Sequence, residues 1–225
     1  RFSPQYQYLD QNKEAEERIY EGETPGVSYG DIAERYYTVG QYMKEVKDVS
    51  KAMAAAGDSY ICDEYLNAMG SPEAESVYVL HDLNNDGIEE FFIGLKFNYD
   101  IPYYVIYDVY TWKDGRAYQL MRGIGYRNGS CKICENGVIE DNYSGSAWDG
   151  QTLYHILPEG GIELETIDSV SSRRDGTVQS YYHWNELIDE NSLQTILEQY
   201  QPESVTYVDC NRETIEQLRL SGIRK

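Results

Sequence analysis

The stretch HDLNNDGIEEFFIG, residues 81–94, is the most chemically specific part of the sequence because oxygen-bearing side chains recur in it at alternate positions. Five groups in it could bind one cation: the side chains of Asp82, Asn84, Asp86 and Glu90 and the backbone carbonyl of Ile88. Alternate spacing turns short carboxylate and amide groups toward a common point, and Gly87 permits the sharp turn that adds a carbonyl. Hard oxygen ligands of this kind suit Ca²⁺ rather than zinc or copper. We expect a structural ion, since one ringed by protein oxygens has no open position for catalysis.

The same loop allows a simpler interpretation, in which residues 85–87 form a tight hairpin turn with solvated carboxylates. It departs from a helix-loop-helix calcium site because its twelfth position is Ile93 rather than glutamate. The flanking stretches VYVL and EFFIGL are also strand-like. The loop is therefore predicted to join two strands, with or without an ion.

Aromatic residues on predicted strands are a second candidate feature, and three are candidate ligand-binding residues: Tyr104, Tyr110 and Trp112. Rings exposed in a row would make a platform for a glycan or a protein partner, because tyrosine and tryptophan supply contact area at low entropy cost. Rings packed beneath helices would be core, which we expect of most of them.

Motifs for other catalytic chemistry are weak. The sequence has no Gly-x-Ser-x-Gly elbow, no His-Glu-x-x-His, no phosphate-binding glycine loop and no dinucleotide fingerprint. The three histidines, at positions 81, 155 and 183, lie in alternating apolar surroundings and are expected to be strand residues. A non-enzymatic binding or structural role is favoured. The alternative is an extracellular hydrolase of glycans or peptides that uses a carboxylate pair, but abundance among 39 acidic residues does not locate such a pair.

The four cysteines are too few for a disulfide scaffold; they are Cys62, Cys131, Cys134 and Cys210. The CKIC stretch lies in an alternating, strand-like segment, where residues three apart point to opposite faces. No redox or zinc site is therefore expected there, and the disulfide state stays open.

Charge and hydropathy restrict the partners. The formal charge is −20, which disfavours nucleic acid and anionic membrane and fits cations, basic partners or neutral sugars. No apolar run approaches the roughly 18 to 20 residues of a transmembrane helix. The sequence starts at Arg1 without a methionine or an apolar signal segment. We expect a processed extracellular or cell-surface-anchored protein, and nothing in the sequence indicates its oligomeric state.

The pattern of apolar residues predicts an α+β fold, with an antiparallel β-meander and helices from both ends of the chain packed against it. Residues 1–30 are expected to form an irregular arm, and residues 31–225 a single domain. Within that domain, 31–70 reads as helical with Asp31 as N-cap, 76–184 as the sheet and 186–225 as a helical C-terminal part. Apolar residues share one face of the first predicted helix: Ile32, Tyr36, Val39, Met43, Val46, Val49 and Met53. Turn pairs punctuate the predicted sheet at residues 114–115, 136–137, 149–150, 160–161 and 175–176.

The pattern Asp-Leu-Asn-x-Asp-Gly-x-x-Glu-Phe-x-Ile-Gly resembles the calcium-loop signature of FG-GAP and VCBS-type repeats, in which the loop joins two strands. Together with YDVYTWKDGRAYQL and CENGVI, it resembles uncharacterised secreted or lipid-anchored proteins of Gram-positive gut anaerobes over residues 76–200. The resemblance implies calcium ligation by the five groups of the 82–90 loop and an extracellular or lipoprotein location. It implies no catalytic residue. A single copy of the loop argues against a full propeller.

Overall fold

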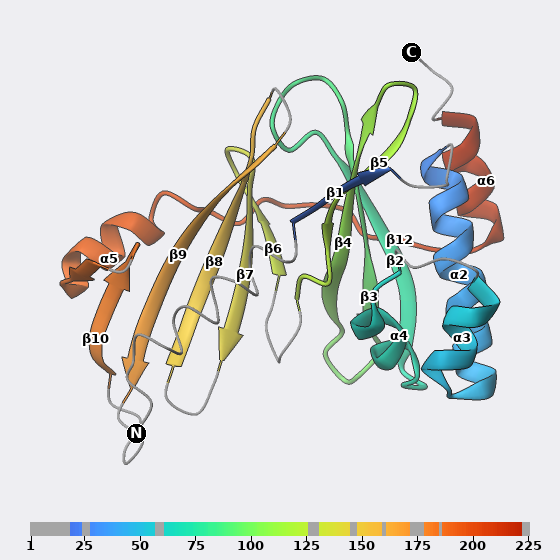
Figure 1. Ribbon diagram of the computed structural model, residues 1–225, viewed down its shortest axis with the longest axis horizontal. Helices are drawn as coiled ribbons and strands as arrows, with labels where there is room; N and C mark the ends of the chain where they lie inside the picture. The colour runs from blue at the N-terminus through green and yellow to red at the C-terminus, as the bar shows by residue number, and fades with distance from the viewer. Residues whose placement is uncertain are drawn as a thin grey trace. The chain divides into compact units, whose positions relative to one another are not determined.

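The computed structural model describes residues 19–23, 28–56, 61–125, 131–144, 148–158, 161–171, 178–184 and 186–221. The fold is α+β, with antiparallel sheets and helices from both ends of the sequence (Figure 1). The described strands form two six-stranded sheets, in the orders β1-β5-β4-β3-β2-β12 and β11-β10-β9-β8-β7-β6.

The chain divides into two compact units, whereas the sequence predicted one domain with one sheet. The first unit comprises residues 20–82, 87–124 and 205–225, and the second comprises 1–19, 83–86 and 125–204. The two sheets have the same sequence pattern, in which strands and hairpin turns recur without interruption. The sequence therefore did not mark where the first sheet ends and the second begins. Most of the predicted N-terminal arm lies outside the described residues, which include a strand at Ile19–Glu23.

The first unit packs helices on one face of its sheet (Figure 1). Its elements are β1 (Ile19–Glu23), α2 (Tyr29–Val46), α3 (Val49–Ala56), α4 (Asp63–Met69), β2 (Ala74–His81), β3 (Glu90–Phe97), β4 (Tyr103–Lys113), β5 (Arg116–Arg122), β12 (Val208–Asp209) and α6 (Arg212–Ser221).

Helix α2 begins earlier than predicted. Ser28, not Asp31, is its N-cap, and Asp31 closes a capping box by accepting from the Ser28 backbone N–H at 3.1 Å. The helix ends before Lys47, whose φ of 50° is left-handed, so the predicted long helix is two helices.

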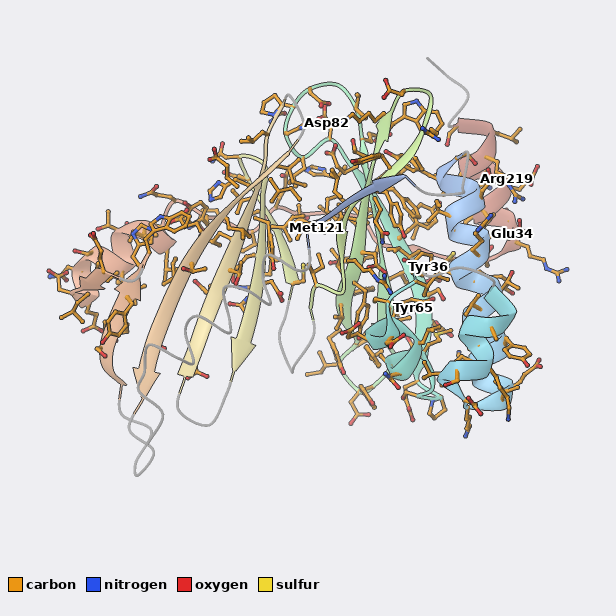
Figure 2. All side chains as sticks on the ribbon, in the orientation of Figure 1. Glu34, Tyr36, Tyr65, Asp82, Met121 and Arg219 are labelled. Atoms are coloured by element: carbon orange, nitrogen blue, oxygen red, sulfur yellow. The ribbon has the colours of Figure 1, made fainter. Side chains whose placement is uncertain are left out.

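The apolar stripe of α2 is confirmed, since Ile32, Tyr36, Val39 and Met43 are all buried. They pack with α4 and with the inner residues of β3 in one core cluster. Tyr36 and Tyr65 meet edge to face there, with ring centroids 4.9 Å apart (Figure 2). Across α2 and α6, Arg219 forms an ion pair with Glu34 (Figure 2).

A β-bulge interrupts the alternation of β4. Ile93 pairs with Asp108 and Gly94 with Ile106, so Tyr107 has no partner on β3. The inserted residue reverses the alternation, so the side chains of Tyr107 and Asp108 both point toward the helices. Two residues further on, the side chain of Tyr110 points the same way. A Cβ on Gly94 would lie 2.1 Å from the carbonyl oxygen of Val105, so this close approach of the strands requires glycine.

Asp108 is fully buried in this core and is held by hydrogen bonds. Its carboxylate accepts from the Tyr36 hydroxyl at 2.5 Å and from the Gly123 backbone N–H at 2.9 Å. Burial raises the pKa of Asp108 to about 6, and these hydrogen bonds oppose that rise. Tyr36 also bonds Tyr110 at 2.8 Å, which continues the network across the sheet.

The second unit is an antiparallel meander. Its elements are β6 (Cys131–Cys134), β7 (Val138–Ser144), β8 (Trp148–Ile156), β9 (Ile162–Ser171), β10 (Val178–His183), β11 (Glu186–Ile188) and α5 (Glu190–Leu197). Helix α5 contacts β10, and its Leu193 joins a small core on one face of the sheet.

Two of the predicted turn pairs are confirmed as hairpin turns. Asn136 and Gly137 have φ of 64° and 78°, and Asp114 and Gly115 have φ of 52° and 79°. The turn predicted at 149–150 was wrong, because these two residues lie inside β8 and pair with both β7 and β9. The remaining two pairs fall wholly or partly outside the described residues.

The C-terminal part is less helical than predicted, since β11 and β12 accompany α5 and α6. None of the four cysteines forms a disulfide, and all are buried. No helix among the described residues is long and apolar enough to span a membrane.

Candidate functional site

The five predicted calcium ligands do not belong to one unit. Asn84 and Asp86 group with the second unit, whereas Asp82, Ile88 and Glu90 group with the first. Each is therefore described by its own contacts.

The loop backbone and side chains are locally ordered. The Asp82 carboxylate accepts from the Gly87 backbone N–H at 2.9 Å, and Gly87 has a φ of 87°. Asn84 donates its Nδ2 to the Leu157 carbonyl at 3.1 Å, and its Oδ1 accepts from the Asp86 backbone N–H at 3.2 Å. The same Nδ2 also donates to the Asp86 carboxylate at 3.2 Å, so both the nitrogen and the oxygen of the Asn84 amide face the loop.

Glu90 fits the predicted calcium site poorly. It is completely buried at the start of β3, and its Oε1 accepts from the Thr111 hydroxyl at 3.1 Å. Ligation would require this buried carboxylate to give up its hydrogen bond from Thr111. Among the residues that the structure describes, no group of three His, Cys, Asp or Glu side chains could hold a metal. The calcium loop thus stays a prediction that rests on Asp82, Asn84, Asp86 and the Ile88 carbonyl.

The three aromatic residues predicted to bind a ligand lie in different environments. Tyr110 is 0% exposed beneath α2, so it contacts no ligand from solvent, and this prediction is corrected. Trp112 is partly buried and meets the Tyr29 ring edge on at 5.8 Å. Tyr104 is partly exposed and stacks on Tyr207, with ring centroids 4.0 Å apart. The bulge in β4 explains the error, because it turned Tyr110 and Trp112 toward the core.

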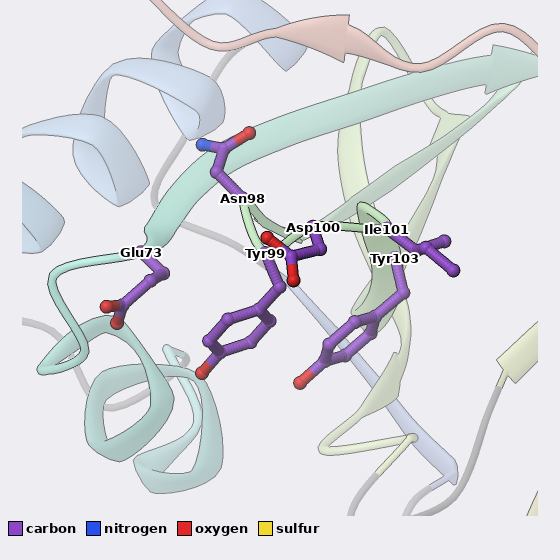
Figure 3. A pocket seen from close by; sticks show the side chains of 6 residues that line it. All are labelled: Glu73, Asn98, Tyr99, Asp100, Ile101 and Tyr103. Carbon is purple, nitrogen blue, oxygen red and sulfur yellow. The ribbon is translucent and has the colours of Figure 1, made fainter.

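A pocket lined by exposed aromatic rings lies in the connection between β3 and β4. It is an open pocket of about 680 Å³, here named the tyrosine pocket (Figure 3). Its lining residues are Glu73, Asn98, Tyr99, Asp100, Ile101 and Tyr103. The volume lies within the range of roughly 300 to 1,000 Å³ that is usual for small-ligand sites.

Two parallel rings form one wall of the tyrosine pocket. Tyr99 and Tyr103 have ring centroids 5.9 Å apart and planes 13° apart, and their hydroxyl groups point the same way (Figure 3). Both stack on Phe97, with centroids 6.3 Å and 4.8 Å from its ring. Because Phe97 is buried, it fixes the planes of rings that are themselves 50% and 47% exposed. A ligand would therefore meet a half-exposed aromatic surface that is backed by Phe97.

The polar side chains of the pocket are carboxylates and an amide. The Ser71 hydroxyl donates to Glu73 at 2.7 Å, and this hydrogen bond lowers the pKa of Glu73. The Asn98 backbone N–H donates to the Glu73 carbonyl at 3.0 Å, and this hydrogen bond joins the residue before β2 to the connection between β3 and β4. Burial raises the pKa of Tyr103, and Tyr99 adds to the rise, so the Tyr103 hydroxyl stays a neutral donor and acceptor at physiological pH. Within the described residues, neither tyrosine hydroxyl has a hydrogen-bond partner.

A second polar cluster lies on one face of the second sheet, around Glu165. His155 and Tyr200 contact its Oε2 at 2.9 Å and 2.6 Å, and His183 contacts its Oε1 at 2.7 Å. Burial alone would raise the pKa of Glu165, but the hydrogen bonds from His155, Tyr200 and His183 outweigh it and lower the pKa to about 2. Because the carboxylate is ionised, both imidazoles donate their Nε2–H to it.

Two glutamates, Glu140 and Glu165, lie on this face, where the hydrolase alternative would need a carboxylate pair. Leu153 pairs with Glu140 on one side and with Glu165 on the other, so the two glutamates lie two strands apart, about 10 Å between Cα atoms. Each of the two carboxyl groups, however, accepts hydrogen bonds from several side chains. Glu140 accepts from Lys132 at 2.9 Å and from Asn142 at 2.6 Å. Since its hydrogen bonds favour the ionised form, the Glu165 carboxyl is not suited to act as the general acid.

No family model matches this chain, and neither the curated proteins nor the solved structures provide a match. The function must therefore be inferred from the geometry of its own side chains.

The tyrosine pocket was missed at the sequence level because its residues follow no period. The stretch NYDIP connects two strands, and such connections are usually made of polar turn residues. A tyrosine and an isoleucine in a five-residue connection were the available signal.

Proposed function

We propose that this chain is a non-enzymatic glycan-binding domain that acts outside the cell or at its surface. The observation that carries the proposal is the pair of parallel, half-exposed rings of Tyr99 and Tyr103 in an open pocket with polar neighbours. The apolar face of a sugar ring stacks on such a surface, because C–H groups pack on the face of an aromatic ring. Carboxylates and an amide at the pocket wall supply acceptors and donors for sugar hydroxyls.

The extracellular setting is supported by composition and by the resemblance of the 82–90 loop to calcium loops of secreted proteins. A charge of −20 suits a domain that must stay soluble and avoid anionic surfaces. We include in the proposal one structural Ca²⁺ on that loop, held by Asp82, Asn84, Asp86 and the Ile88 carbonyl.

The proposal is tested by probing an array of neutral, basic and acidic glycans with the wild-type chain and with Tyr99→Ala/Tyr103→Ala. We expect a set of glycans that the wild type retains and the double variant loses. Trp184→Ala is the matched control, because Trp184 is 53% exposed and lies on the second unit. Identical retention by the wild type and the double variant would overturn the proposal.

Ile101 provides a control on the kind of partner. It is 83% exposed beside the rings and has no polar atom in its side chain. A glycan site should tolerate Ile101→Ser within about twofold in affinity, whereas a protein interface centred on this loop would lose much more.

A further inference from the structure

Among the residues that the structure describes, every group that lines the tyrosine pocket is neutral or negative. The described lining residues include Glu73 and Asp100, and none of them is a lysine, arginine or histidine. Hydrogen bonding lowers the pKa of Glu73, which is therefore ionised at neutral pH. Within the described part of the chain, no lysine or arginine forms an ion pair with either carboxylate.

The aromatic wall adds to this negative field. The face of a tyrosine ring carries the negative part of its quadrupole, so it attracts a cation held above it. Tyr99 and Tyr103 are each about half exposed, at 50% and 47%, and Figure 3 shows Glu73 on the Tyr99 side of the pocket. A group that stacks on these rings thus lies within reach of carboxylates, and the net charge of −20 adds a long-range contribution of the same sign.

On the basis of the proposed function, we infer that the ligand of the tyrosine pocket is a glycan with free amino groups, a protonated 2-amino-2-deoxy sugar, rather than its N-acetylated or acidic counterpart. The sugar ring stacks on Tyr99 and Tyr103, and its ammonium group faces Glu73 and Asp100. Acetylation removes the positive charge and leaves the stacking surface intact. Uronic or sialic acids bring a negative charge toward two carboxylates and are repelled.

The test compares glucosamine oligomers with N-acetylglucosamine oligomers of the same length, by isothermal titration at pH 6 and low salt. Two carboxylates within about 5 Å of one ammonium group predict roughly tenfold tighter binding of the amino form in exposed surroundings. The preference should shrink in 0.5 M salt because exposed charges are screened. It should fall to within about twofold in Glu73→Gln/Asp100→Asn, a double variant that keeps the shape of the pocket.

A polycation could also adhere to an acidic protein without using the pocket. The matched control is Glu198→Gln/Glu213→Gln, which removes the same charge from two exposed positions outside the pocket. This control should keep the full preference. An equal loss in both double variants would overturn the inference, because the preference would then be general rather than local.

The two proposals fail in distinguishable ways. Equal affinity for both oligomers, lost in Tyr99→Ala/Tyr103→Ala, would overturn the amino-sugar inference and leave the glycan-binding function in place. Binding of both oligomers that is unchanged in the tyrosine variant would overturn both proposals.

Discussion

Single residues in this chain show how an exposed aromatic surface is separated from a core made of the same side-chain types. Tyr110 and Tyr103 lie on one strand, yet Tyr110 is buried and hydrogen-bonded whereas Tyr103 is half exposed and stacked. The difference comes from position along β4, since the helices cover its middle and leave its start open. Tyrosine serves both roles because it has an apolar body and a polar tip.

Asp108 should make stability fall as pH rises. Its folded pKa of about 6 is above the ordinary value of 3.8, so its stabilising contribution is complete below about pH 4 and is lost as pH rises through 6. We expect Asp108→Asn to remove a decline of roughly 2 to 3 kcal/mol across this window. Urea unfolding of both proteins between pH 4 and 7 measures it, and curves that run parallel would contradict the assigned pKa.

Glu165 should make stability fall as pH decreases, which is the opposite of the effect of Asp108, and it should do so in a more acidic range. Its folded pKa of about 2 is below the ordinary 4.5, so its contribution is present above about pH 4.5 and is lost as pH falls toward 2. Relative to Glu165→Gln, the wild type should lose about 1 to 2 kcal/mol over that range, after allowance for partial solvent screening. The check is the difference in unfolding free energy between the two proteins from pH 5 to pH 2.5. A constant difference would mean that the histidine and tyrosine hydrogen bonds do not hold the carboxylate ionised.

At the scale of elements, the sequence predicted periodic features well and irregular ones poorly. The buried stripe of α2 and the hairpin turns at residues 114–115 and 136–137 followed from side-chain period and from the left-handed preference of Asn, Asp and Gly. The bulge in β4 did not, because an inserted residue leaves no mark in an alternating pattern until the partner strand is known. The turn pair at 149–150 was overridden by two neighbouring strands.

The close approach of β3 and β4 at the bulge gives a prediction about Gly94. A Cβ there would lie 2.1 Å from a backbone oxygen, which no side-chain rotation can relieve. Gly94→Ala should therefore destabilise the protein by about 3 kcal/mol in urea unfolding. Gly115→Ala is the control, since its Cβ would meet nothing within 4 Å and would add only the strain of a φ of 79°, about 1 kcal/mol. Equal losses in the two variants would show that backbone conformation, not the strand contact, is decisive.

At the scale of the whole molecule, the α+β class and the positions of the helices at the two ends of the chain were predictable, whereas the division into two units was not. The candidate sites differ in the same way, since features that are local in sequence were predictable and contacts between distant segments were not. The prediction of a calcium loop could be made because the proposed ligands are spaced locally in the sequence. The tyrosine pocket joins Glu73 to residues 98–103, a contact that exists only once β2 and β3 pair.

Calcium should stabilise the whole chain if the 82–90 loop binds it. Adding 1 mM Ca²⁺ to chelator-stripped protein should raise Tm by several degrees, because an ion that binds the folded state alone stabilises it in proportion to the logarithm of its concentration. Asp82→Ala or Asp86→Ala should abolish the rise, and Mg²⁺ should not reproduce it. An unchanged Tm would reduce the loop to a hairpin connection and would leave the tyrosine pocket unaffected.

The most direct measurement is the affinity of the best-retained glycan for the wild type, for Tyr99→Ala and for Tyr103→Ala, by isothermal titration. If each ring contributes a stacking contact, each single variant should bind about tenfold more weakly, which corresponds to about 1.4 kcal/mol per ring. Trp184→Ala should bind as the wild type does. Affinities that are unchanged in both tyrosine variants would contradict the central claim that the tyrosine pocket is the binding site.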